Sequence, residues 1–281
     1  MHQEVLSANC SASGASLRQE SANANKTVAN ASSIQNAGME RLHSPKGLGA
    51  WKIEDLARMS RARNYFAWQS RLVSREIGRR VVEVGCGVGN FTGMLLDRDV
   101  VIAVDPDAEC LRRVRERFPN QPNLHTVQAD ASDEAFLEVA GFRPDACVCL
   151  NVLEHIEDDE QAARNMASVI APGGAVVLLL PAFPALYGPI DRNLGHHRRY
   201  RRRDAARLAG AAGLRVRRAR YMNAIGFFGW WMNARVLRRD TQSAAQIDLF
   251  DQALVPLMSR LERIAAPPFG QSLFAVLEKP V

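Results

Sequence analysis

The sequence predicts a doubly wound α/β fold, in which helices cover both faces of a largely parallel sheet. Short runs of apolar and β-branched residues recur between residues 81 and 181. Segments with the apolar spacing of amphipathic helices separate these runs. Apolar strands that alternate with amphipathic helices are typical of a parallel sheet that is buried on both faces.

A helical pattern precedes the first strand. Apolar residues recur with a helical period from Trp51 to Ile77, so we expect a helical region ahead of the sheet. The predicted strands are 81–85, 100–105, 124–130, 146–150, 175–181, 214–221 and 273–279. The helices expected between the early strands cover about 90–96, 108–118, 134–139 and 159–170.

Residues 1–45 differ in composition from the rest of the chain. They are rich in Ser, Ala and Asn and show no apolar period, so we expect a disordered leader, with a transit peptide as the alternative. No stretch approaches the ~18 consecutive apolar residues of a membrane-spanning helix, and no secretory signal is indicated. The five cysteines form no CxxC pair, which favours a reducing, cytoplasmic setting and gives no indication of a metal site.

The net charge of +6 has a local origin. Residues 191–220 contain eleven Arg and two Asp, a local charge of +9, which leaves −3 for the rest of the chain. Proteins that bind nucleic acid more often spread basic residues along a face or a tail. We therefore interpret this segment as part of a binding site and do not expect nucleic acid as a partner.

A glycine-rich turn follows the first predicted strand. Glycines at 85, 87 and 89 would let a ligand approach the backbone at the start of a helix. Asn90 stands where the dinucleotide fingerprint has a third glycine. Asp105 ends the next strand twenty residues after Gly85, the distance at which a carboxylate meets ribose hydroxyls in nucleotide-binding α/β folds. The alternative for Asp105 is a helix N-cap, because Asp-Pro-Asp opens helices well.

With these residues the chain resembles the class I S-adenosylmethionine-dependent methyltransferases over roughly residues 55–220. Residues 81–93 (VVEVGCGVGNFTG) are similar to motif I of that family. The later motifs follow in the family's order as VIAVDPD (101–107), QADASD (128–133), CLNVLEHIEDD (149–159) and APGGAVVLLLP (171–181). The resemblance implies a Rossmann-like sheet of seven strands with the last one antiparallel, and S-adenosyl-L-methionine as the cofactor.

The resemblance also implies a cofactor site. Glu83 and the glycines would cradle the methionine part, Asp105 the ribose and Asp130 the adenine amino group, although Asp130 has a turn residue as its alternative. His155 would lie just beyond the methionine end. The expected cofactor-binding residues are Tyr65, Glu83, Gly85, Cys86, Gly87, Gly89, Asn90, Asp105, Pro106, Asp130, Ala131, Asn151 and Val152.

Two further segments are similar to a bacterial, small-molecule group of this superfamily. One is a helix containing NYFAW (64–68), whose Tyr65 would fold over the cofactor. The other is the segment 181–200, which ends in GHHRRY (195–200) and follows the fifth strand, where the acceptor must bind. Its Pro and Gly residues are expected to exclude a regular helix, and long ordered loops beside a site are usually functional.

This second segment supplies most of the expected acceptor chemistry. Histidine has a pKa suited to a general base, although His155 has the alternative role of orienting its loop. The planar guanidinium of Arg198 suits a carboxylate or phosphate, whereas residues 201–203 are expected to form a solvated helix start. The candidate catalytic residues are His155, Tyr187, His196, His197 and Tyr200, and the candidate substrate-binding residues are Asp191, Arg198 and Trp230.

Residues 222–272 form an insertion before the last strand. Its aromatic run at 227–231 either caps an apolar acceptor pocket or packs as a helical cover on the sheet edge. A third alternative is a membrane-surface helix with Arg235, Arg238 and Arg239 toward lipid headgroups, which implies peripheral membrane contact.

Together these features predict one methyltransferase domain over residues 46–281. Its expected parts are a helical lid at 46–78, a cofactor-binding core at 79–181 and an acceptor half at 182–281. The predicted reaction is in-line transfer of a methyl group to a small anionic or amphiphilic acceptor, such as an isoprenoid or lipid-linked metabolite. The alternatives are an RNA or protein methyltransferase that docks through its arginines, and a non-catalytic S-adenosylmethionine-binding protein.

Overall fold

The computed structural model describes residues 56–233 and 244–281. The expected leader, the start of the predicted lid, and Arg235, Arg238 and Arg239 lie outside these described residues. In the part of the chain that is described, no helix has both the length and the apolarity needed to cross a bilayer.

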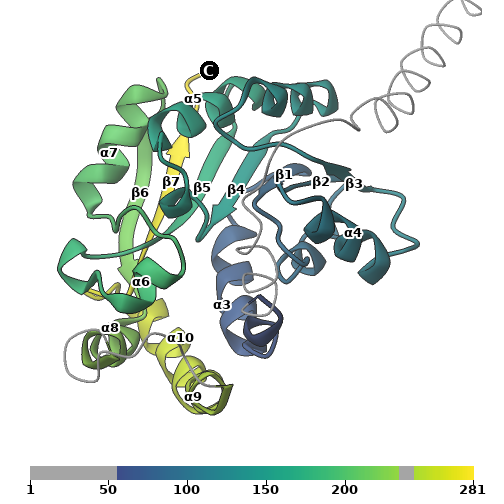
Figure 1. The fold of residues 1–281 in the computed structure, drawn as a ribbon. Helices are drawn as coiled ribbons and strands as arrows, with labels where there is room; N and C mark the ends of the chain where they lie inside the picture. The colour runs from purple at the N-terminus through teal and green to yellow at the C-terminus, as the bar shows by residue number, and fades with distance from the viewer. Residues whose placement is uncertain (1–55, 234–243) are drawn as a thin grey trace, which may run out of the picture. The chain divides into compact units, whose positions relative to one another are not determined.

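Within residues 56–233 and 244–281, seven strands form one sheet in the order β3-β2-β1-β4-β5-β7-β6 (Figure 1). The strands are β1 (Arg80–Val84), β2 (Val100–Val104), β3 (Leu124–Val127), β4 (Ala146–Leu150), β5 (Ala175–Pro181), β6 (Arg215–Met222) and β7 (Ser272–Glu278). β1 to β5 pair in parallel, and β7 runs antiparallel to both β5 and β6. The predicted doubly wound sheet with an antiparallel last strand is therefore confirmed.

Helices lie along both faces of this sheet (Figure 1). The α-helices are α3 (Arg63–Val73), α4 (Ala108–Arg117), α5 (Asp159–Val169), α6 (Pro189–Asn193), α7 (Arg202–Ala211), α8 (Ala224–Trp231), α9 (Ala244–Leu249) and α10 (Val255–Ile264). The 3₁₀ turns are Thr92–Met94, Glu134–Phe142, Leu153–His155 and Pro184–Leu186, and Phe250–Leu254 forms a π-helical turn.

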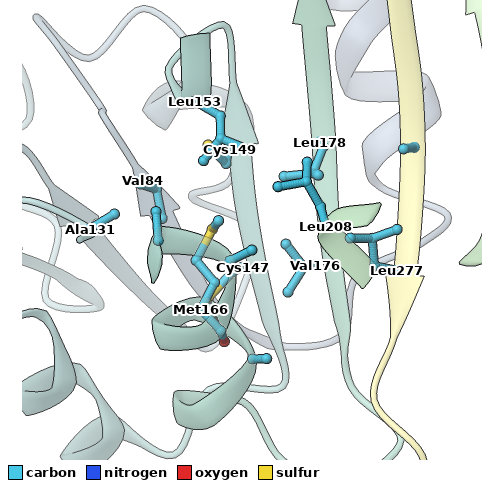
Figure 2. Packing of buried hydrophobic residues seen from close by; sticks show 14 of the residues in the cluster. Val84, Ala131, Cys147, Cys149, Leu153, Met166, Val176, Leu178, Leu208 and Leu277 are labelled. Atoms are coloured by element: carbon cyan, nitrogen blue, oxygen red, sulfur yellow. Dashed lines mark hydrogen bonds between the residues drawn. The ribbon is translucent and has the colours of Figure 1, made fainter. Parts of the chain in front are cut away.

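The strand side chains pack into two hydrophobic cores, one on each face of the sheet, because successive side chains of a strand point to opposite faces. On one face, strand residues such as Cys147 and Leu178 pack with Met166 of α5 and Leu208 of α7 (Figure 2). On the other face, strand residues pack against α3 and α10. The five central strands are buried on both sides, which leaves the carboxyl edge of the sheet for a ligand site.

Two local predictions were wrong. Residues 90–96 form only the 3₁₀ turn Thr92–Met94, because Gly89 at φ +78° turns the chain and Phe91 and Leu95 enter the second core. Conversely, the segment 181–200 contains the short helix α6. Pro189 occupies its first turn, where no N–H bond is needed, and Asp191 accepts the Gly188 N–H at 2.9 Å.

Candidate functional site

The glycine-rich turn after β1 has a backbone that only glycine adopts freely. Gly85 and Gly87 have φ of +69° and +53°. The N–H groups of Gly85 and Cys86 donate to the Val104 carbonyl, at 2.8 and 3.0 Å. A Cβ atom on Gly85 would lie 2.4 Å from Cγ2 of Val152, so the close packing of Val152 leaves the turn no room for a larger residue.

Two buried carboxylates stand at the ends of β1 and β2. Glu83 accepts a hydrogen bond from Thr92 Oγ1 at 2.6 Å, and burial raises its pKa to about 8 despite that bond. Asp105 accepts the N–H groups of Gly87 and Asp107, each at 2.9 Å. The N-cap of α4 is Asp107, whose Oδ1 accepts the Glu109 N–H, so the alternative of Asp105 as a cap is wrong.

These groups line one cavity of about 800 Å³ at the carboxyl edge of the sheet. Ligand sites typically occupy about 300–1,000 Å³, so a cavity of this size accommodates a large ligand or two adjoining ones. Among the described residues, the wall includes every expected cofactor residue except Gly89. A Cβ on Gly89 would instead meet Phe118 and Val114, which shows that this glycine serves the packing of α4. Asp130 lines the cavity and also makes the turn bonds of its alternative role, to Ser132 N–H and Oγ.

Helix α3 forms the cover on the cofactor side. The N–H groups of Asn64 and Tyr65 donate to the buried carboxylate of Asp251, at 3.1 and 2.8 Å. This carboxylate, 187 residues away in the chain, fixes the start of α3 and brings Tyr65 and Phe66 into the cavity wall. Asp251 could not be recognised from the sequence, because it lies in a turn with no motif.

The far end of the cavity carries a polar cluster. Glu154 and His155 lie on the 3₁₀ turn after β4, and His196 follows α6. The rings of His155 and His196 meet edge to face with centroids 4.7 Å apart, and His196 Nε2 lies 4.0 Å from Glu154 Oε1. Burial raises the pKa of Glu154 to about 7, although the charges of His196 and Arg199 act in the opposite direction.

Behind this cluster lies a buried ion pair. Asp191 accepts from His196 Nδ1 at 2.9 Å and from Arg199 Nε at 2.8 Å. Burial alone would raise the pKa of Asp191, but the bond from His196 and the charge of Arg199 bring it below its ordinary value. Asp191 therefore stays a carboxylate and holds both side chains in position.

An apolar wall completes this end of the cavity. It consists of Ile190, Leu194, Ile225, Phe228 and Trp230. The Trp230 ring lies under the Arg199 guanidinium, with 4.6 Å from Cζ to the ring centroid. Asn223 caps α8 by accepting the Gly226 N–H, so the wall helix begins at a defined point.

Comparison with known proteins bears on this arrangement. A family described as a methyltransferase domain matches residues 52–219. The chain belongs to this methyltransferase domain family. An uncharacterized methyltransferase of Mycobacterium tuberculosis is 39% identical over 107 residues, which cover 38% of this chain and 52% of the relative. A second one from the same species is 30% identical over 131 residues, 46% of this chain and 50% of the relative. The chain thus spans about half the length of these relatives.

Solved structures share the methyltransferase fold. One is a protein solved in complex with the Haloferax volcanii Trm112 methyltransferase activator, with a TM-score of 0.58, 17% identity, and coverage of 85% of this chain and 100% of that one. Another is an S-adenosylmethionine-dependent methyltransferase from Mesorhizobium loti, with a TM-score of 0.50, 16% identity, and coverage of 75% and 96%. By family this chain is a methyltransferase domain, and its fold is the one that these solved structures share.

The residues at the glycine-turn end of the cavity fit S-adenosylmethionine, the cofactor that the sequence predicts. Gly85 and Gly87 bring the backbone into the cavity wall, and the buried carboxyl groups of Glu83 and Asp105 suit an ammonium group and ribose hydroxyls. Asn151, at φ +54°, turns the chain so that the end of β4 borders the same space. Positive φ is tolerated by Asn better than by most residues.

The arginine-rich segment of the methyltransferase domain needs the largest correction. The predicted alternation placed Arg198 and Tyr200 toward the acceptor, but Arg198 pairs with Asp159 at 3.2 Å and Tyr200 is 1% exposed, with its hydroxyl donating to Leu153 O. Arg199, which was not predicted, lines the cavity instead. The reason is that Tyr200 pairs with Ala182 beside β5 and enters the core, which turns its neighbour inward. Residues 201–203 are exposed at the start of α7, as expected.

Three more predicted residues lie outside the cavity wall that the described residues form. Tyr187 donates its hydroxyl to the His196 carbonyl and braces that loop. His197 is exposed, and its backbone N–H donates to Glu154 O. Asp191 supports His196 and Arg199 from behind. Of the predicted acceptor residues, His155, His196 and Trp230 line the cavity, and Glu154 joins them as a residue that the sequence did not single out.

Proposed function

We propose that this methyltransferase transfers a methyl group from S-adenosylmethionine to a hydroxyl or amine of a small amphiphilic acceptor. The observation that carries this is the division of one cavity into two ends. Glu83, Asp105 and the glycine turn mark the cofactor end, and the aromatic and aliphatic wall around Trp230 marks the acceptor end. The cluster of Glu154, His155 and His196 stands in the same wall, where an acceptor's polar atom would lie.

The arginines favour an apolar acceptor over an anionic one. Arg198 is paired with Asp159, and Arg199 is paired with Asp191 and stacked on Trp230. Arg207 pairs with Asp159 and Glu160. A guanidinium already neutralised by a carboxylate has little attraction left for a ligand anion. We therefore narrow the predicted acceptor to an amphiphile with an apolar body.

In this proposal, S-adenosylmethionine supplies an electrophilic methyl group for an in-line displacement. The chain's residues position and enclose the reactants, and positioning of this kind lowers barriers by roughly 7–11 kcal/mol in favourable cases. Tyr65 and α3 exclude water from one side, and α8 does so from the other. The proton of the acceptor leaves toward the cluster of Glu154, His155 and His196.

The two alternative functions have less support. Docking of RNA or protein would have to use exposed arginines such as Arg192, Arg201 and Arg203. Arg198, Arg199 and Arg207 are already paired with carboxylates. A pure S-adenosylmethionine sensor would have no use for the second, apolar end of the cavity. The methyl-transfer assay described below distinguishes both alternatives from the proposed function.

We also propose peripheral contact with a lipid surface. Phe228 lines the cavity yet is 57% exposed, and Trp231 beside it is 45% exposed. Leu257, Leu261 and Ile264 on α10 are exposed as well. An amphiphilic acceptor would enter from such a surface. In a co-sedimentation experiment with anionic vesicles, we expect the protein in the vesicle pellet. Its absence from the pellet would refute this proposal.

The test is a methyl-transfer assay with labelled cofactor. Long-chain alcohols, prenylated phenols, short-chain carboxylates and total RNA are offered separately, and the products are extracted and counted. We expect labelled methyl groups in the long-chain alcohols or prenylated phenols, and only background radioactivity in the short-chain carboxylates and the RNA. Label in RNA would favour the docking alternative, and background in all classes with intact cofactor binding would favour the sensor.

A further inference from the structure

Glu154, His155 and His196 form a compact set of metal-ligating side chains. One donor atom from each, a carboxylate oxygen and two imidazole nitrogens, lies within 4.8 Å of the others. The set joins a turn after β4 to a loop after α6, segments about forty residues apart in the chain. All three residues line the acceptor cavity, so a ligand there would have access to them.

His196 is oriented for coordination by its other nitrogen. Asp191 accepts hydrogen bonds from Arg199 Nε and from the Gly188 N–H, so it is also the acceptor toward His196 Nδ1. This places the His196 proton on Nδ1 and leaves Nε2 its lone pair. That lone pair faces the cluster, since Nε2 is the atom 4.0 Å from Glu154. A carboxylate behind the distal nitrogen is the usual support of a metal-binding histidine, because it fixes the tautomer and the ring.

Glu154 supplies an independent observation. The side chain is 1% exposed, and its Oε2 atom has no hydrogen-bond partner among the described residues. A buried carboxylate oxygen without a partner is costly, and such atoms usually mark a ligand or ion. Its neighbours in the cluster are two imidazoles rather than a second carboxylate.

We propose that Glu154, His155 and His196 bind one divalent transition-metal ion of the zinc type at the acceptor end of the cavity. Two histidines and one glutamate form a known catalytic zinc set that leaves a coordination position open. The bound ion would take the acceptor's oxygen in that position and lower its pKa, so that the acceptor's proton would pass to solvent and not to a side-chain base of the cluster. This role rests on the proposed function, whereas the binding site itself does not.

Charge and size agree with this assignment. Two acidic side chains, Glu154 and Asp191, stand against one guanidinium, Arg199, so the cluster holds more acidic than cationic groups beside its histidines. Donor atoms around a zinc ion lie about 3.4 Å apart for bond lengths near 2.1 Å. The present donor atoms lie within 4.8 Å of one another, so the widest possible pair would have to approach by up to about 1.4 Å.

The test measures metal binding directly on the full chain loaded with S-adenosylhomocysteine. Zn²⁺ is titrated calorimetrically into wild type, Glu154→Gln, His196→Gln and His197→Ala. His197 is the matched control, since it adjoins His196 but is exposed and lies outside the described cavity wall. We expect one Zn²⁺ for wild type and the control, and a loss of at least about 100-fold in affinity for the other two, more than second-shell changes cause.

The affinity of each variant for S-adenosylhomocysteine is measured in parallel, and an affinity equal to that of wild type shows that the variant is folded. The absence of Zn²⁺ binding by wild type, equal binding by all four proteins, or a loss in His197→Ala would overturn the site. If a variant does not fold, the Co²⁺ absorption spectrum of the wild-type protein tests the site instead. A nitrogen and oxygen ligand spectrum supports the site, and thiolate-to-cobalt charge transfer contradicts it. Zn²⁺ binding without methyl transfer would refute the proposed function alone.

Discussion

His196 Nδ1 lies 2.9 Å from Oδ1 of Asp191, and the two side chains are 8% and 0% exposed. The same carboxylate oxygen accepts from Arg199. The buried Asp191 carboxylate therefore sets the tautomer of the His196 imidazole and neutralises the Arg199 guanidinium. It also accepts the N–H of Gly188 at the start of α6. The acceptor end of the cavity depends on this single residue.

Asp191→Asn should destabilise the fold. The amide keeps the shape but leaves the Arg199 charge uncompensated, and breaking a buried ion pair costs about 3–5 kcal/mol. Urea denaturation measures the free energy of unfolding. Glu116→Gln, which breaks an exposed pair with Arg112, is the control and should change it by less than about 1 kcal/mol. Equal effects of the two substitutions would refute this view of Asp191.

The pKa of Glu83 predicts a pH dependence of stability. Its folded pKa of about 8 exceeds the ordinary value of 4.5, so the folded state holds a proton that the unfolded state releases between these values. The stability that this proton contributes is complete below pH 4.5 and is lost as the pH rises toward 8. Without cofactor, the free energy of unfolding of wild type should therefore fall over this range relative to Glu83→Gln, by on the order of a few kcal/mol. Parallel pH profiles for the two proteins would contradict this.

Gly85→Ala should disrupt the cofactor end. The new Cβ would lie 2.4 Å from Val152 at a backbone φ of +69°, so both the turn and the Val152 side chain must shift. We expect S-adenosylhomocysteine affinity to fall at least about tenfold, because the loop geometry is lost. The control Gly210→Ala lies in α7, where an added Cβ meets no atom within 4 Å. It should keep its affinity and gain about 0.5–1 kcal/mol of stability.

Trp230→Ala should raise the acceptor KM and leave cofactor affinity unchanged. Loss of a buried aromatic wall removes roughly 1.5–3 kcal/mol of apolar contact, which corresponds to about a 10- to 100-fold increase in KM. Trp231→Ala is the matched control, since Trp231 is 45% exposed and lies outside the wall formed by the described residues. Steady-state kinetics with the amphiphile that is methylated best would make the comparison, and equal KM values would argue against this wall.

The cofactor end was largely predictable because it is local. Glu83 and the glycines occupy one strand and one turn, and Asp105 and Asn151 follow strands whose carboxyl ends meet at one edge of a parallel sheet. Periodicity and spacing predicted the strands, the glycine turn and Asp105, and the resemblance to class I methyltransferases implied Glu83 and Asn151. Gly89 was the exception, because a glycine that packs on a helix has the same sequence signature as one that admits a ligand.

The acceptor end was less predictable because its contacts join distant segments. Whether Arg198 or Arg199 faces the cavity depends on where Tyr200 enters the core, and no periodicity reports that. The partners of Asp191 and Glu154 come from different loops, so the metal-ligating cluster has no signature spacing. Asp251, which caps α3 across 187 residues, is a further contact of this kind.

Calorimetric titration with S-adenosylhomocysteine tests the central claim most directly, on wild type, Asp105→Ala and Asp107→Ala. Asp107 caps α4 and lies outside the described cavity wall, so its removal should affect stability alone. We predict one ligand per wild-type chain, an unchanged affinity for Asp107→Ala, and an affinity about 10- to 100-fold lower for Asp105→Ala, through lost hydrogen bonds to a charged group. An absence of binding by wild type, or equal affinities for all three proteins, would contradict the assignment of this cavity.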